Sequence, residues 1–302
     1  MTDPYPRYLN LLKNGELVKR TTAAKKILEH CTLCPWNCGI SRMNDEKGQC
    51  QTGAQARVYS YMVHHGEEKP LRGSRGSGTI FFSGCNLHCQ YCQNYDISQD
   101  TYGLLVSVER LAGMMMELQA RGCHNINLVS PTHVVPQILE ALVIAAKEGL
   151  RLPLVYNTGG YDNVETLRLL DGIVDIYMPD MKYAEADIAL RYSGVKDYPK
   201  FNQAAVKEMH RQVGDLETNE NGIAERGLLI RHLVLPGQLA GTKEIMLFIS
   251  GKISQNSYVN LMDQYRPDYH ARDFPKLNRK VTKGEFNQAV AWAMETGLDR
   301  LD

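Results

Sequence analysis

The stretch "TIFFSGCNLHCQYCQNY", residues 79–95, joins an apolar run typical of a β-strand to three closely spaced cysteines. Cys85, Cys89 and Cys92 stand at C-x3-C-x2-C spacing directly after the run. A structural zinc site takes four ligands in a closed tetrahedron, and an electron-transfer 4Fe–4S cluster normally takes four cysteines. Three thiols on one short loop therefore predict a metal centre with an open coordination position, where chemistry can occur.

Further apolar runs follow the first one at intervals along the chain. They are "NINLVS" (125–130), "LPLVYN" (152–157), "IVDIYMPD" (173–180), "GLLIRHLVL" (227–235) and "SYVNLM" (257–262). Segments of helical period separate them, and near-continuous apolar strands that alternate with helices are typical of buried parallel strands. The sequence thus predicts an α/β fold with six strands, fewer than the eight of a full barrel.

Capping signals mark three of the predicted helices. Ser107 precedes the apolar positions 111, 114, 115 and 118, and Gly122 ends that run. Pro136 stands where a first helical residue is expected, with Gly149 at the far end. Thr282 and Glu285 form a capping-box pattern near the C-terminus.

Composition narrows the class of protein. Apolar residues make up 43% of the 302 residues, which is ordinary for a globular protein with a buried core. Lys plus Arg and Asp plus Glu each number 34, and this balance argues against a nucleic-acid partner bound by bulk charge. The N-terminus lacks an apolar signal region, and no run approaches the roughly 20 residues of a membrane span. We therefore expect a cytoplasmic protein without a membrane partner.

A second group of cysteines lies near the N-terminus. Cys31, Cys34, Cys38 and Cys50 have C-x2-C-x3-C-x11-C spacing, and such clustering favours metal over disulfides. Four thiolates suit either zinc or an auxiliary 4Fe–4S cluster, and the spacing does not separate the two. A structural role is favoured because the segment has few apolar residues and needs a metal to stay folded. We expect residues 1–75 to form this four-cysteine, metal-binding extension and residues 76–302 to form the barrel domain.

The C-x3-C-x2-C loop, with Tyr91 before its last cysteine, resembles the radical S-adenosylmethionine (SAM) superfamily. The resemblance implies a partial (βα)6 TIM-like barrel and a 4Fe–4S cluster held by three thiolates. In that superfamily the fourth iron binds SAM, and one electron cleaves SAM to a 5′-deoxyadenosyl radical that abstracts hydrogen. It also implies a low-potential electron donor of the flavodoxin or ferredoxin type.

The resemblance extends over nearly the whole chain. The motifs that carry it are "CxLCPxxCG", "HGEE", "GSGTIFFSGCN", "CQNYDISQ", "PTH", "DIYMPDMKY", "RHLVLPG" and "QY". Together they are similar to the iron–sulfur protein branch related to pyruvate formate-lyase activating enzymes. This similarity implies hydrogen abstraction from the glycine of a glycyl-radical enzyme as the activity.

Residues of the SAM site follow from the same resemblance. Tyr91 is expected against the adenine, and Ser130 lies where the superfamily contacts the SAM amino group, although the usual Gly-Gly-Glu is missing. "MPDMK" resembles a Met-x-Asp-x-Lys pattern that helps hold a monovalent cation beside the SAM carboxylate. The expected cofactor-binding residues are Tyr91, Asn94, Ser130, Asn157, Thr158, Met178, Asp180, Lys182 and Arg231.

Simpler interpretations remain for several of these residues. Asp180 and Lys182 could be a mutually satisfied pair at the barrel rim, and Arg231 could be a structural polar residue. The "HGEE" segment either covers the cluster or forms a solvated charged loop. Cys123 is most simply a small buried hydrophobic residue.

Departures from the activating enzymes leave the substrate open. This chain has no ferredoxin insert after the three-cysteine loop, Gln93 replaces a frequent histidine, and Asn157 replaces an acidic cation ligand. The enzymatic alternative is radical modification of another peptide, RNA or small molecule. Two other classes are a non-catalytic metal-stabilised binding protein and a simple electron carrier.

Overall fold

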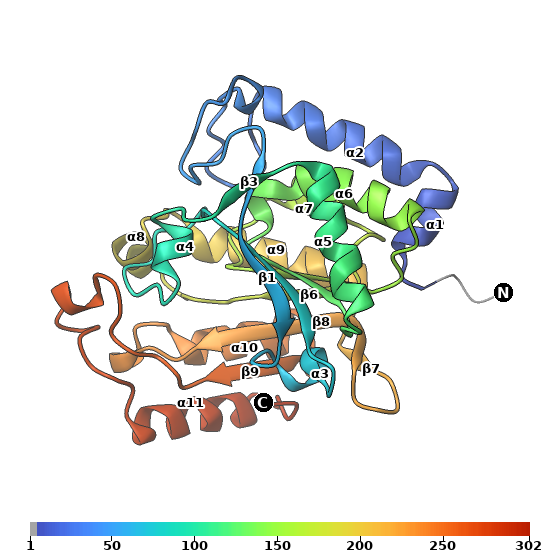
Figure 1. Ribbon diagram of the computed structural model, residues 1–302. Helices are drawn as coiled ribbons and strands as arrows, with labels where there is room; N and C mark the ends of the chain where they lie inside the picture. The colour runs from blue at the N-terminus through green and yellow to red at the C-terminus, as the bar shows by residue number, and fades with distance from the viewer. Residues whose placement is uncertain (1–4) are drawn as a thin grey trace.

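Six parallel strands form the wall of an open barrel within residues 5–302, the part of the chain that the computed structural model describes (Figure 1). Residues 1–4 of the predicted N-terminal extension lie outside the described residues. The parallel strands are β2 (Ser77–Phe82), β4 (Ile126–Val129), β5 (Leu154–Thr158), β6 (Ile176–Pro179), β8 (Ala224–Leu233) and β9 (Tyr258–Met262). Each pairs in parallel with the next, which confirms the α/β class and all six predicted strands.

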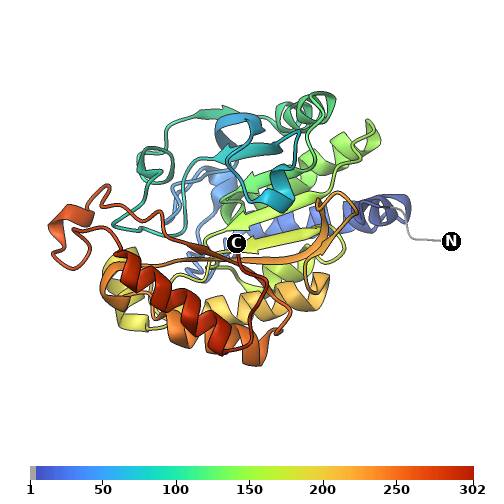
Figure 2. The same cartoon turned by 90° about the horizontal axis from the view of Figure 1, so that it is seen from below.

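Helices cover the outer surface of this wall (Figures 1 and 2). The longer ones in the barrel region are α5 (Val108–Ala120), α6 (Val135–Lys147), α9 (Tyr198–Val213), α10 (Thr242–Lys252) and α11 (Lys283–Glu295). Other short helices are α3 (Lys69–Arg72), which packs against the barrel interior through Leu71, α4 (Tyr95–Ser98), α7 (Val164–Leu169) and α8 (Ala186–Ser193). Two predicted caps are confirmed: Ser107 accepts from the Arg110 N–H, and Thr282 and Glu285 form a capping box. Pro136 is the second residue of α6 instead of the first.

Side chains along each strand point alternately to the helices outside the barrel and to its interior, and so form a large outer core and a smaller inner one. Leu228 and Ile230 of β8 belong to the large core under the helices. Leu229, between them, belongs to a second apolar cluster with Leu71 of α3 and Val155 of β5. Because neighbouring strand residues point to opposite faces, this second cluster fills the barrel interior. Arg231, two residues after Leu229, therefore faces the same interior at the carboxyl end of β8.

The N-terminal region contains more regular structure than the sequence suggested. Helices α1 (Tyr8–Lys13) and α2 (Glu16–Lys26) precede the first cysteines, and α2 packs on α6, with a Lys25–Glu140 ion pair of 2.6 Å. Strand β1 (Ala56–His64) pairs antiparallel with β2, and β3 (Leu104–Val106) pairs with β1. The two-residue β7 (Glu217–Thr218) pairs with β8. β1 thus extends the barrel sheet beyond its first parallel strand.

Short 3-10 turns complete the described structure. They span Ile27–Glu29, Arg42–Asn44, Thr132–Val134, Pro236–Gln238 and Ala271–Asp273. Among residues 5–302, no helix has the length and apolar character that a bilayer crossing requires.

Candidate functional site

The three cysteines of the 83–95 stretch lie on the loop that leaves the carboxyl end of β2. All three are free thiols, and each sulfur has a hydrogen-bond partner. The Leu87 N–H donates to the Cys85 sulfur at 3.4 Å. The Ser193 hydroxyl donates to Cys89 at 2.9 Å, and the Ser98 hydroxyl lies 3.1 Å from Cys92. The loop is therefore built with polar groups directed at its sulfur atoms.

Burial makes the thiols of Cys85 and Cys89 poor acids. Burial, followed by the charge of Cys89, raises the pKa of Cys85 to about 12. Burial also raises the pKa of Cys89 to about 11, while the nearby Lys182 ammonium lowers it. Metal binding at this loop must therefore displace protons, as thiolate ligation does in general.

The loop offers three thiolates and no evident fourth ligand. His88, the imidazole within the motif, has its Nδ1 2.9 Å from Gln99 Oε1, and its ring meets the edge of Trp36. Within residues 5–302, no group of three or more His, Cys, Asp or Glu side chains is arranged to hold a single metal ion. Three thiols with hydrogen-bond donors and a neighbouring cation suit an anionic cluster that takes three protein ligands.

A charged network lies at the carboxyl ends of the neighbouring strands. Asp180 follows β6, and its two oxygens accept from Lys182 Nζ at 2.6 Å and from Arg231 Nε at 2.8 Å. Arg231 also donates to Asn157 Oδ1 of β5 at 2.8 Å. Burial alone would raise the pKa of Asp180, but the two cations outweigh it and hold the pKa below its ordinary value. Asn157, Asp180, Lys182 and Arg231 thus lie together, with Asp180 and Lys182 in the mutual ion pair of the simpler interpretation, and their expected contacts with SAM stay predictions.

In the "HGEE" segment Glu68 is buried and Glu67 is half-buried, whereas His65 and Gly66 are exposed. Glu68 is buried, with Oε1 3.8 Å from Arg231 and 3.1 Å from the Asn260 amide of β9. Burial, with the charge of Glu68, raises the pKa of Glu67 to about 7, although Arg231 opposes this shift. The acidic pair therefore continues the charged network towards β9, on the side where a six-strand barrel is open.

Other predicted cofactor residues are more dispersed. Thr158 donates to Asp162 Oδ2 at 2.7 Å, and Ser130 takes a left-handed φ of 57° after β4. Tyr91 is buried against Tyr265, with ring centroids 5.7 Å apart. Asn94 is exposed at the start of α4, and Met178 lies in the inner apolar cluster, below the charged network. Their expected contacts with SAM stay predictions.

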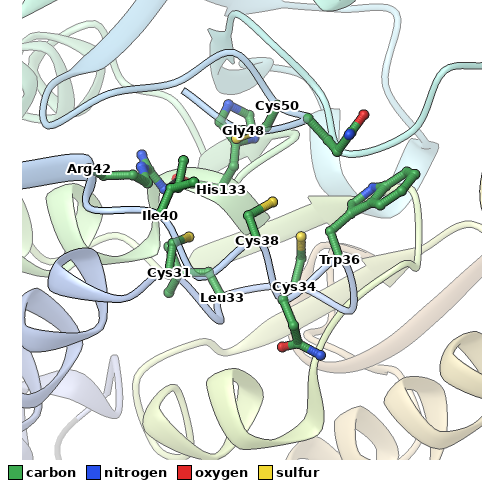
Figure 3. Close-up of a pocket in the computed structure, with 12 residues that line it drawn as sticks. Cys31, Leu33, Cys34, Trp36, Cys38, Ile40, Arg42, Gly48, Cys50 and His133 are labelled. Carbon is green, nitrogen blue, oxygen red and sulfur yellow. Dashed lines mark hydrogen bonds between the residues drawn. The ribbon is translucent and has the colours of Figure 1, made fainter. Parts of the chain in front are cut away.

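The N-terminal cysteines line one pocket (Figure 3). Cys31, Cys34, Cys38 and Cys50 share it with the side chains of Leu33, Trp36, Ile40 and Arg42, among others. Burial raises the pKa of Cys34 well above its ordinary value and also raises that of Cys50. The structure therefore places the four predicted cysteines around one pocket, and a metal or cluster at this group stays a prediction. Cys123, by contrast, is buried in the large apolar core, as expected.

Several polar residues of this region have no signal in the sequence. Ser98 and Ser193 reach the cysteine sulfurs, and Ser193 comes from α8, about 100 positions away in the chain. Asp162 is buried and accepts from Thr132, Tyr156 and Thr158. Serines and a lone aspartate without a motif are too common to single out, so only the fold reveals their positions.

Comparisons with known proteins agree with the cysteine loop. The sequence model described as the Radical SAM superfamily matches residues 79–238. An uncharacterized protein of Methanocaldococcus jannaschii is 33% identical over 300 residues, covering 96% of this chain and 82% of that protein.

Two solved structures share the fold at low sequence identity. A radical SAM methyltransferase from Sphaerobacter thermophilus has a TM-score of 0.50 and 13% identity, covering 74% of this chain and 65% of that one. The FeFe-hydrogenase maturase HydG from Carboxydothermus hydrogenoformans has a TM-score of 0.50 and 12% identity, covering 97% and 63%. The chain thus spans somewhat less than two thirds of these proteins. With a cysteine loop of the right spacing and a match over more than half its length, the chain belongs to the radical SAM superfamily.

Proposed function

We propose that the protein cleaves SAM reductively and uses the resulting radical to abstract hydrogen from a partner molecule. The observation that carries this proposal is the loop of three thiols beside the Asp180–Lys182–Arg231 network. When bound, a 4Fe–4S cluster supplies the electron that breaks a carbon–sulfur bond of SAM and yields the 5′-deoxyadenosyl radical.

The residues of the loop have separate roles in this proposal. Cys85, Cys89 and Cys92 would hold the cluster as thiolates. Ser193 and Ser98 donate or accept at two of the sulfurs, and such hydrogen bonds tune the reduction potential of a cluster. Lys182 lowers the pKa of Cys89 and Cys85 and so offsets part of the negative charge that thiolates bring.

The charged network would position SAM. Arg231 and Lys182 are half-buried cations suited to a carboxylate, and Asp180 and Asn157 fix their orientation. The carboxylate of SAM could take part in this network because two cations share Asp180. A monovalent cation at this position remains part of the proposal, as does the contact of Tyr91 with the adenine.

For the substrate, we propose a glycine of a glycyl-radical enzyme, with electrons supplied by a flavodoxin- or ferredoxin-type protein. The "MPDMK" stretch supports this choice, because its Asp180 and Lys182 form the ion pair beside the cysteine loop. The alternatives are hydrogen abstraction from another peptide, from RNA or from a small molecule.

The substrate is tested with a glycyl-radical enzyme from the same genome. The anaerobic mixture of reduced protein, SAM and this candidate should show a glycyl radical by EPR, and deuterium at the glycine should appear in 5′-deoxyadenosine. Cys92→Ala serves as the control and should give no radical. SAM cleavage without a glycyl radical or deuterium transfer would reject this substrate and leave the alternatives.

A further inference from the structure

The pocket among the N-terminal cysteines has features of a built ligand site. Figure 3 shows the four cysteine side chains around it, with apolar neighbours such as Leu33 and Ile40. Gly48 leaves room for the Cys38 sulfur, since a Cβ at this glycine would lie only 2.7 Å from it. Any larger residue would displace that thiol, so the chain keeps space for sulfur at this position.

A buried cation accompanies the N-terminal group. Arg42 is fully buried and donates to the carbonyl oxygens of Gly53 at 2.9 Å and His133 at 2.7 Å. It lines the same pocket as the four cysteines. Both hydrogen bonds hold the guanidinium in place, so it can offset the negative charge of four metal-bound thiolates.

Residues on both sides of Cys85 contact the N-terminal group. Gly84, at φ +82°, packs so closely that a Cβ would lie 2.4 Å from the Cys50 carbonyl oxygen. On the other side, the Asn86 carbonyl oxygen accepts a hydrogen bond from Trp36, a residue that lines the N-terminal pocket. The ligand loop of one group thus contacts Cys50 and Trp36 of the N-terminal segment.

Trp36 forms a second connection between the groups. It lines the N-terminal pocket, and its indole N–H donates to the Asn86 carbonyl oxygen at 2.8 Å. The edge of its ring meets His88, inside the C-x3-C-x2-C loop, at a centroid distance of 6.3 Å. A path of packed and hydrogen-bonded residues therefore runs from Cys34 to Cys85.

We propose that Cys31, Cys34, Cys38 and Cys50 hold a second iron–sulfur cluster that exchanges one electron with the cluster at Cys85, Cys89 and Cys92 through Asn86 and Trp36. A zinc ion could stabilise the 31–50 segment by itself and would not need contacts with the residues on both sides of Cys85. Those contacts shorten the distance that an electron must cross, and they favour a redox-active centre. The proposal rests on the proposed function for the cluster at Cys85.

The electron balance of this step is simple. The reduced N-terminal cluster loses one electron, and the cluster at the Cys85 loop gains it. A low-potential protein donor of the flavodoxin or ferredoxin type restores the electron to the N-terminal cluster. No bond to protein atoms forms or breaks, and the cysteines stay ligands throughout.

Metal analysis of the full-length protein tests the first half of the proposal. After anaerobic reconstitution with iron and sulfide, about eight irons per chain are expected, four for each cluster. Cys85, Cys89 and Cys92 together changed to alanine should leave about four irons, and Cys31, Cys34, Cys38 and Cys50 together changed to serine should also leave about four. Cys123→Ala, outside both groups, should keep about eight.

The three-alanine variant keeps the test decisive if the four-serine variant does not fold. About four irons in that variant support a second cluster. Its complete loss of iron, or one zinc per chain in protein purified without added metal and kept through reconstitution, would overturn the proposal.

EPR of the dithionite-reduced protein tests the connection. Two neighbouring reduced clusters should couple, so the wild-type spectrum should be broadened and should differ from the sum of the spectra of the two variants. A spectrum equal to that sum would refute electronic contact. Measurement of 5′-deoxyadenosine in the same samples separates the two proposals. If a protein with zinc and only about four irons forms 5′-deoxyadenosine, the second cluster is rejected and the proposed function stands. If two coupled clusters are present without SAM cleavage, the proposed function is rejected and the second cluster stands.

Discussion

At the scale of single residues, hydroxyl groups directed at sulfur distinguish the cysteine loop from an ordinary surface turn. Ser193 donates to Cys89 at 2.9 Å and also lies 2.7 Å from the Tyr183 hydroxyl, which fixes its orientation. The sequence carries no hint of this contact, because α8 reaches the loop only in the folded chain. A hydrogen bond to a cluster ligand stabilises the reduced, more negative cluster.

Ser193→Ala should therefore make the cluster harder to reduce. We expect a more negative midpoint potential, with iron affinity lowered by about 10-fold or more, as for other residues that support a metal ligand. Redox titration followed by EPR measures the potential, and Ser250→Ala, whose hydroxyl bonds the distant Thr296 carbonyl, is the matched control. An unchanged potential in Ser193→Ala would show that the hydroxyl does not act on the cluster.

Glu67 gives a prediction for the pH dependence of stability. Its pKa is raised to about 7 by burial and by Glu68, whereas an unfolded glutamate titrates near about 4.3. Between these values the folded chain binds more protons, so this group lowers the free energy of unfolding as the pH rises towards 7. Glu67→Gln should remove this loss.

Urea unfolding at pH 5 and pH 8 measures the effect. Relative to wild type, Glu67→Gln should gain stability between these pH values, by about 3 kcal/mol at most. Asp175, whose pKa burial also raises to about 7, contributes the same slope in both proteins and cancels in the difference. If the free energy of unfolding changed with pH equally in the two proteins, the raised pKa of Glu67 beside Glu68 would be contradicted.

At the scale of elements, the turn between β2 and the cysteines depends on one glycine. Gly84 combines a left-handed backbone with close contact to the Cys50 carbonyl oxygen. Gly122, which follows α5, has a similar φ of 81° but nothing within 4 Å of a Cβ position. Substitution of either glycine therefore introduces backbone strain, but only substitution of Gly84 also introduces a steric clash.

Gly84→Ala should weaken cluster binding, whereas Gly122→Ala should not. Both substitutions cost roughly 1–2 kcal/mol for the left-handed conformation. Only Gly84→Ala also pushes the loop away from Cys50, so we expect at least a twofold loss of bound iron in that variant after reconstitution. Similar iron contents in the two variants would show that the contact does not position the loop.

The sequence predicted the elements that carry continuous apolar runs and missed those that do not. All six barrel strands and the caps of α5 and α11 were predicted, because their signals are local. β1 was missed because it lies at the open side of the barrel, where Tyr59 and Met62 are exposed and the apolar alternation is blurred. Its partner β3 is three residues long and exposed, so it pairs through the tertiary fold.

The candidate site divides in the same way. The cysteines have a spacing that the sequence displays, and Asp180 and Lys182 are two residues apart. The positions of Glu68, Asn86 and Ser193 follow from the closure of the barrel, which brings together segments far apart in the chain. Polar residues without a spacing motif cannot be assigned before that closure is known.

At the scale of the whole molecule, the barrel brings three sets of residues to one end. The cysteine loop follows β2, the charged network follows β6 and β8, and the N-terminal cysteine segment packs beside the loop. Parallel strands place their carboxyl ends on the same side, which explains why residues from positions 85 to 231 meet there. The 31–50 segment joins them through the contacts of Trp36 and Cys50 with the cysteine loop. The gathering of these three sets of residues at one end of the barrel is the structural basis for a radical SAM enzyme.

Cleavage of SAM tests this account most directly. The reconstituted protein, reduced with dithionite under anaerobic conditions and mixed with SAM, should form 5′-deoxyadenosine and methionine in equal amounts. Cys92→Ala should form neither, while Cys123→Ala should match wild type. A protein with an intact, reduced cluster that forms no 5′-deoxyadenosine would contradict the account, because the open position predicted from three thiols would then bind no SAM productively.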